Sequence, residues 1–219
     1  MGISKLVSLE YLDLSFTGTR QLPTELKALE KLKCLSLEYL GDRITIPRGF
    51  IPGLSKLKTL RMICSFPFAE EAVEDKSTEC LAEELQCLNH LNALTVSVTS
   101  AFALNRFLSA ELLHSCTEQI GLHSFMDSKQ LNILSLANIK SLLWMRLRDW
   151  ESLEEVKTEW EGEGRMIKAP KSQISSIATQ KWFQSLQNVS IVDCSNLKDI
   201  TWLTLTPNLG YFHVAKWKK

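Results

Sequence analysis

The 219-residue sequence predicts an α/β solenoid, with short parallel strands in a concave sheet and short helices or irregular turns on the convex side. Large apolar residues recur at intervals of three, three and two in residues 6–14. The same spacing returns twenty-three residues later, in residues 29–37. Apolar residues two apart point to one face of a strand. A pattern that recurs at a fixed period indicates repeats stacked on one another.

Copies of this pattern continue to the C-terminal end. They are Leu6, Leu9, Leu12 and Leu14; Leu29, Leu32, Leu35 and Leu37; Leu57, Leu60 and Met62; Leu91, Leu94 and Val96; Ile120 and Leu122; Leu131, Leu134 and Leu136; Leu142, Met145 and Leu147; Leu186, Val189 and Ile191; and Leu209, Phe212 and Val214. Such spacing is typical of leucine-rich repeats, so we expect a curved stack of about eight or nine of them. The whole chain, residues 1–219, is predicted to be one such domain.

The segments between the strands form the return path, which leads the chain from the end of one strand to the start of the next. Gly18 permits a tight bend and Pro23 can open a short helix after the first strand. Amphipathic spacing predicts further helices, one through Leu81, Leu85 and Leu88, and one through Leu104, Phe107, Leu108 and Leu112. Residues 151–180 mix charge, glycine and proline without a sustained period, and we expect an insertion loop there.

Composition and motifs argue against several classes of function. Lys and Arg together number 25, as do Asp and Glu, so the overall charge favours neither nucleic acid nor an anionic membrane. No run is long and apolar enough for a membrane span or a signal peptide. The six cysteines are expected to be reduced. We expect no metal, no cofactor and no catalytic site, because the four histidines are dispersed and Cys194 fits a structural position of the repeat.

Two stretches resemble a known family. "LEYLDLSFTGTRQLPTELKALEKLKCLSLEY" and "LQNVSIVDCSNLKDITWLTLTPNLGYFHV" look like the leucine-rich-repeat region of plant intracellular nucleotide-binding disease-resistance proteins of the coiled-coil class. The second stretch is the more specific, with Cys194, then Leu197 to Leu203 with Ile200 in place of a leucine, then Pro207 to Leu209. A phosphate-binding G-x-x-x-x-G-K-[ST] motif is absent from this chain.

The resemblance implies the sensor region of a cytoplasmic innate-immune receptor. Such a region recognises a pathogen effector or a guarded host protein, and it restrains a nucleotide-binding switch domain, which this sequence lacks. The chain is therefore expected to be a fragment of a longer receptor or a truncated product. An alternative of a different class is a substrate-recognition module of a ubiquitin-ligase adaptor or another scaffold, because the same solenoid would serve it equally well.

Binding should then depend on the strand residues that flank each buried pair. The sequence places Ile63, Thr95, Ser97 and His123 among these outward positions, together with a row from Ile133, Ser135 and Ala137. The candidate protein-binding residues are Tyr11, Asp13, Arg61, Trp144, Arg146, Arg148, Tyr211 and His213. Tryptophan, tyrosine and arginine most often dominate binding energy. The alternative is that these side chains only keep the sheet soluble.

Overall fold

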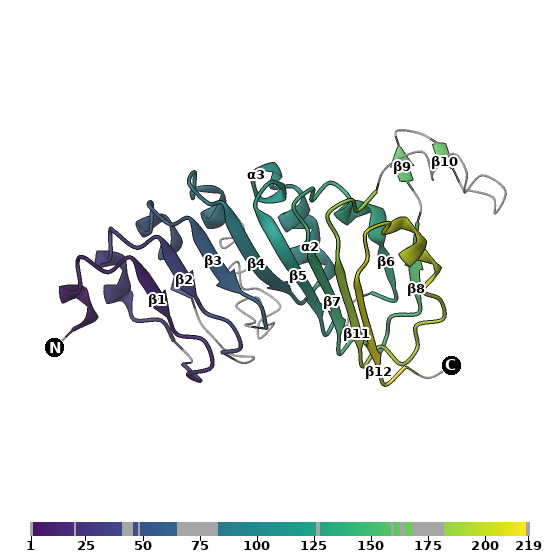
Figure 1. Ribbon diagram of the computed structural model, residues 1–219, viewed down its shortest axis with the longest axis horizontal. Coiled ribbons are helices and arrows are strands. Elements are labelled where there is room, and N and C mark those ends of the chain that lie inside the picture. The colour runs from purple at the N-terminus through teal and green to yellow at the C-terminus, as the bar shows by residue number, and fades with distance from the viewer. Residues whose placement is uncertain are drawn as a thin grey trace.

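The chain folds around one large, curved parallel sheet. The computed structural model describes all residues except 1, 20, 41–45, 48, 65–82, 126–127, 159, 163–164, 168–181 and 218–219. The sheet has eight strands in the order β1-β2-β3-β4-β5-β7-β11-β12. Figure 1 shows them side by side from the N-terminal to the C-terminal end. Their bounds are β1 (Tyr11–Asp13), β2 (Cys34–Ser36), β3 (Thr59–Met62), β4 (Ala93–Val98), β5 (Thr117–His123), β7 (Trp144–Arg148), β11 (Asn188–Val192) and β12 (Tyr211–Ala215).

The repeated leucines form the core, as the spacing predicts. Leu35 is fully buried and lies in register between Leu12 of β1 and Leu60 of β3. Leu26 of the return segment belongs to the same buried cluster, so the segments that connect the strands cover this face of the sheet. The opposite face is the concave one. The predicted leucine-rich-repeat solenoid is confirmed.

The return path is built mainly from short helical turns, because about twenty residues per repeat leave little room for longer helices. The 3₁₀ helices are η1 (Ile3–Lys5), η2 (Thr24–Ala28), η3 (Ile51–Gly53), η4 (Ile133–Leu136) and η5 (Thr201–Leu205). The α-helices are α2 (Ala101–Leu108) and α3 (Glu111–His114), and residues 83–86 are also helical. Ser100 caps α2 by accepting a hydrogen bond from the Ala103 N–H at 3.1 Å.

The helix predicted through Leu104 and Leu112 is in fact two helices. The chain leaves the helical conformation at Ala110, which is fully buried, and Leu112 of α3 is 42% exposed. The other predicted amphipathic helix is described only in part. Leu85 is buried within the helical residues 83–86, Leu88 is buried but follows the end of the helix, and Leu81 lies outside the described residues.

The predicted strand through Leu131, Leu134 and Leu136 is wrong. Residues of β6 (Gln130–Asn132) pair with β8 (Glu155–Lys157) in a separate two-stranded sheet, and β5 pairs directly with β7. A parallel connection needs about a dozen residues or more, and only eight residues lie between Leu122 and Leu131. Residues 130–136 therefore form part of the crossover itself. Their apolar side chains enter the core from the return side, which also removes Ile133, Ser135 and Ala137 from the concave face.

The interval 151–180 begins with β8 and then contains β9 (Trp160–Gly162) and β10 (Arg165–Ile167), which pair in an antiparallel hairpin. These short strands were not anticipated in the predicted insertion loop. The remainder of that loop, 168–180, lies outside the described residues.

A residue with positive φ follows seven of the eight concave strands. These residues are Phe16, Tyr39, Cys64, Ser124, Asp149, Asp193 and Lys216, with φ between 52° and 61°. The left-handed conformation costs a non-glycine residue about 1–2 kcal/mol, so the turn that each repeat makes at this point must be stabilised by the packing around it. At Tyr39 this turn carries the side chain back over the concave face.

Candidate protein-binding site on the concave face

In the middle of the concave face, the side chains that point away from the core are buried and inaccessible to a partner. Thr95 and Ser97 of β4 are 2% and 0% exposed, and their hydroxyl oxygens accept hydrogen bonds from the N–H groups of Met62 (3.1 Å) and Cys64 (2.8 Å). Small hydroxyl side chains thus fold down onto the backbone of the preceding strand. The expectation that Thr95 and Ser97 would be available to a partner is wrong.

Ile63 and His123 are also buried, contrary to the sequence prediction. They are 2% and 0% exposed. Gly121 has no side chain, and the His123 ring fills the space above it: a Cβ placed there would lie 2.2 Å from His123 Nε2 and 3.1 Å from Ile63 Cδ1. Burial, followed by the positive charges of Arg148 and Arg146, lowers the pKa of His123 to about 3. The imidazole is therefore neutral at physiological pH.

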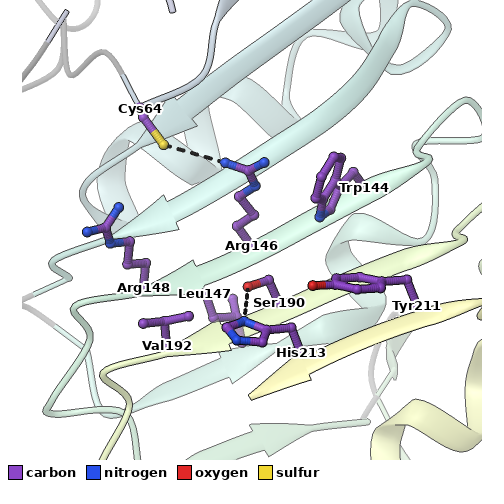
Figure 2. A pocket seen from close by; sticks show the side chains of 9 residues that line it. All are labelled: Cys64, Trp144, Arg146, Leu147, Arg148, Ser190, Val192, Tyr211 and His213. Atoms are coloured by element: carbon purple, nitrogen blue, oxygen red, sulfur yellow. Dashed lines mark hydrogen bonds between the residues drawn. The ribbon is translucent and has the colours of Figure 1, made fainter. Parts of the chain in front are cut away.

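A hollow of about 260 Å³ opens beyond this closed region, over strands β7, β11 and β12. It brings together five of the eight candidate residues predicted from sequence: Trp144, Arg146, Arg148, Tyr211 and His213. Figure 2 shows these side chains projecting from neighbouring strands around one space. Strand pairing sets Arg146 beside Ser190, and Ser190 beside His213. The Ser190 hydroxyl and His213 Nδ1 are 3.4 Å apart.

Arg146 lies at the centre of this site and is half-buried. Its guanidinium carbon is 4.4 Å from the centroid of the Trp144 ring, a cation–π geometry. Nη1 donates hydrogen bonds to the Tyr39 hydroxyl at 2.7 Å and to Cys64 Sγ at 3.7 Å. Burial acts to lower the pKa of Arg146, but the interactions with Tyr39 and Cys64 together outweigh the effect of burial, so the pKa is raised and the charge is retained.

The rim of the hollow carries two ion pairs. Arg148 Nε lies 3.2 Å from a carboxylate oxygen of Asp149, and Lys216 Nζ lies 2.9 Å from one of Asp193. Both acidic residues occupy the positive-φ position after their strands. The exposed charges at the rim are therefore already paired, and the half-buried charge of Arg146 is bonded only to neutral groups within the described residues.

The other three candidate residues lie away from the hollow. Tyr11 and Asp13 are on β1, the edge strand, and Arg61 is on β3; all three are exposed. The Asp13 carboxylate accepts a hydrogen bond from the Ser15 N–H at 2.8 Å, and hydrogen bonds from Ser15 lower the pKa of Asp13. These three residues therefore do not line the hollow with the other five candidates.

Sequence reasoning did not include Tyr39, Cys64, Ser190 and Val192 in the site. Ser190 and Val192 follow from their place beside β7 in the sheet, and the alternation of the repeat already marks both as outward-facing. Tyr39 and Cys64 depend on the left-handed turns after β2 and β3. No simple sequence signal marks those turns, because neither residue is Gly, Asn or Asp.

The cysteines in the described part of the chain form no disulfide, and burial disfavours the thiolate form of two of them. Cys34, Cys64, Cys87, Cys116 and Cys194 are free thiols. Burial raises the pKa of both Cys116 and Cys194 to about 11. Cys194 Sγ donates to the Val192 carbonyl at 3.6 Å, as expected for its position in the repeat. Three or more His, Cys, Asp or Glu side chains are nowhere grouped for a metal among the described residues.

Comparison with known proteins extends this picture. Disease resistance protein RPS5 of Arabidopsis thaliana is 30% identical over 97% of this chain and 22% of its own length. Putative disease resistance protein At4g10780 is 31% identical over 98% and 22%. Probable disease resistance protein At5g47250 is 34% identical over 95% and 23%; both are also from Arabidopsis thaliana. The chain thus spans about a fifth to a quarter of the length of these curated relatives. No family model matches the chain.

Among solved structures, the crystal structure of a TLR13–ssRNA13 complex aligns with 95% of this chain and 31% of that chain, at 16% identity and a TM-score of 0.47. So loose a superposition adds nothing to the strand register described above. Separately, none of the helices within the described residues is long and apolar enough to cross a bilayer.

The parallel sheet, the stacked leucines and the recurring turn define the chain as a leucine-rich-repeat protein. Over nearly its whole length it is related to plant disease resistance proteins. The resemblance seen in the two sequence stretches is confirmed.

Proposed function

We propose that this chain is the protein-interaction and sensor region of a plant innate-immune receptor that acts in the cytoplasm. In this role it recognises a pathogen effector or a host protein, restrains a nucleotide-binding switch domain and has no catalytic activity of its own. The observation that carries the proposal is the similarity to disease resistance proteins across almost the entire chain. The alternative of a ubiquitin-ligase adaptor has no comparable support.

The hollow on β7, β11 and β12 supports a binding role. It offers Trp144, Tyr211 and Arg146 in one concave space, and these residue types are enriched at the energetic centres of interfaces. The closed middle of the concave face separates the hollow from β1. We place the specific contacts of a partner over the C-terminal strands because five of the eight candidate residues meet in the hollow there.

The proposal is tested by expressing in leaf cells the gene product that carries this chain, either intact or with residues 1–219 deleted. A restraining and sensing region predicts that the deletion alters basal cell death and abolishes the response to a matching pathogen. An adaptor predicts instead that a target protein accumulates while cell death stays unchanged. Unaltered basal and elicited cell death in the deletion variant would contradict the proposed function.

A further inference from the structure

The hollow over β7, β11 and β12 is rich in hydrogen-bond donors and short of strong acceptors. Arg146 presents a guanidinium with five N–H donors, of which only those of Nη1 have partners among the described residues. The Trp144 indole Nε1 is buried and has no acceptor in the described structure. A buried donor without an acceptor lowers the stability of a protein by about 1–3 kcal/mol. A partner that brings acceptor oxygens into this hollow could therefore form hydrogen bonds with donors that are unbonded in the described structure.

The electrostatic balance of the hollow favours a single negative charge. Strands β7, β11 and β12 with the residue after each carry three basic side chains, Arg146, Arg148 and Lys216, and two acidic ones, Asp149 and Asp193. Because Arg148 pairs with Asp149 and Lys216 with Asp193, the charge left over is that of Arg146. A half-buried charge without a counter-ion is unfavourable until a partner supplies one.

The same balance argues against a nucleic acid. A phosphate backbone requires a continuous basic track, and here two carboxylates alternate with the basic groups at the rim. The hollow, at about 260 Å³, is also below the range of about 300–1,000 Å³ typical of small-molecule pockets. It has the size for one side chain of a larger partner.

We propose that Arg146, held between the Trp144 ring and the Tyr39 hydroxyl, binds the carboxylate of an aspartate or glutamate from an acidic protein segment laid across strands β7, β11 and β12. The carboxylate accepts from the free Nε and Nη2 edge of the guanidinium, and Tyr211 packs against the residue next to it. Trp144 and Tyr39 fix the plane of Arg146 in advance, so little side-chain entropy is lost on binding. This inference rests on the proposed function, since it names the class of partner for the same surface.

The test measures binding of a hexaglutamate peptide to the full 219-residue chain by fluorescence anisotropy at low and physiological salt. Arg146→Gln is expected to weaken binding by at least about tenfold, because a hydrogen-bonded charge pair is lost. Arg148→Gln should have a smaller effect, since Arg148 is already paired with Asp149. Arg106→Gln is the matched control: its guanidinium also lies over an aromatic ring, at 5.9 Å from the Phe102 centroid, but on helix α2.

The variant Arg146→Lys keeps the test decisive if Arg146→Gln fails to fold. It keeps the positive charge and loses the planar fork, and an affinity several-fold lower than that of the unchanged chain is expected. The proposal is overturned by any of four results: no hexaglutamate binding, equal losses from Arg146→Gln and Arg106→Gln, full affinity in Arg146→Lys, or tighter binding of a hexauridylate. If the peptide result is negative and the deletion in leaf cells still abolishes the response, the pocket chemistry is wrong and the proposed function stands.

Discussion

At the scale of single residues, the buried core leucines contribute most to the stability of the fold. Leu35 is fully buried, with Leu12 and Leu60 in register on either side. Replacing a buried leucine by alanine removes apolar contacts and leaves a cavity. We expect Leu35→Ala to reduce the free energy of unfolding by about 2–5 kcal/mol, measured by chemical denaturation. Leu143→Ala is the control, since Leu143 is 37% exposed; an equal loss in both variants would contradict the assignment.

Gly121 is required by the His123 ring above it. An alanine Cβ would lie 2.2 Å from His123 Nε2, so the buried ring or the strand must shift. Overpacking of this kind costs about 1–3 kcal/mol, and we expect Gly121→Ala to lower the free energy of unfolding by that amount. At Gly210 the nearest atom to an added Cβ is 3.9 Å away. Gly210→Ala should therefore be much less harmful, and equal effects would rule out the packing described here.

His123 predicts a defined loss of stability in acid. Its pKa is lowered to about 3, first by burial and then by Arg148 and Arg146. The unfolded chain takes up this proton below about pH 6.5, whereas the folded chain does not. The stability due to neutral His123 is thus fully present above about pH 6.5 and is lost as pH falls towards 3, by about 1.4 kcal/mol per pH unit.

The measurement is the free energy of unfolding at pH 7, 6 and 5 for the unchanged chain and for His123→Gln. The carboxylates titrate in both proteins, so the difference between the two isolates the histidine. We expect the variant to lose less stability than the unchanged chain between pH 6.5 and 5. Parallel curves would show that His123 is not held neutral.

At the scale of elements, the leucine spacing predicted nine concave strands, of which eight form the sheet and one does not. Residues 130–136 carry the same leucine pattern as a concave strand, yet they form β6 and η4 on the return side. Periodicity reports which residues are buried, and both sides of this core bury leucines. Only the short distance from Leu122 could have shown that another concave strand had no room.

The sequence also predicted the candidate site only in part. Trp144, Arg146, Arg148, Tyr211 and His213 follow from strand alternation alone. The participation of Tyr39 depends on the curvature of the sheet and on a left-handed turn, neither of which local sequence specifies. Thr95 and Ser97 were misplaced because their hydroxyl groups bond to the backbone N–H groups of Met62 and Cys64, and strand alternation does not reveal such contacts.

Strand position predicts the order of hydrogen exchange. β1 spans three residues and, among the described strands, pairs only with β2, whereas β5 spans seven and pairs with β4 and β7 on its two sides. Local opening needs least free energy where few buried contacts are broken. Hydrogen exchange followed by mass spectrometry should find the amides of β1 exchanging fastest and those of β4, β5 and β7 slowest. Equal protection of β1 and β5 would contradict the sheet order.

At the scale of the whole molecule, the two ends of the sheet differ from its interior. Leu6 and Val7 near β1 are 52% and 57% exposed, and Phe212 and Val214 of β12 are each 37% exposed. In neighbouring repeats the residues equivalent to Leu6, Phe212 and Val214 are buried, namely Leu29, Val189 and Ile191. An experiment on the hollow must therefore leave the apolar side chains at these two edges of the sheet unchanged.

If the chain acts through the hollow around Arg146, reversing the charge of the hollow must change its activity. The most direct measurement is basal and elicited cell death in leaf cells that express the gene product with Arg146→Glu and Arg148→Glu together. Lys56→Glu with Lys140→Glu is the control, because it reverses two charges at exposed positions outside the hollow. We expect the arginine variant to accumulate normally and to change basal death or lose the response, since a weakened contact shifts the population between inactive and active states. Unchanged accumulation, unchanged basal death and an unchanged response in the arginine variant would contradict the account.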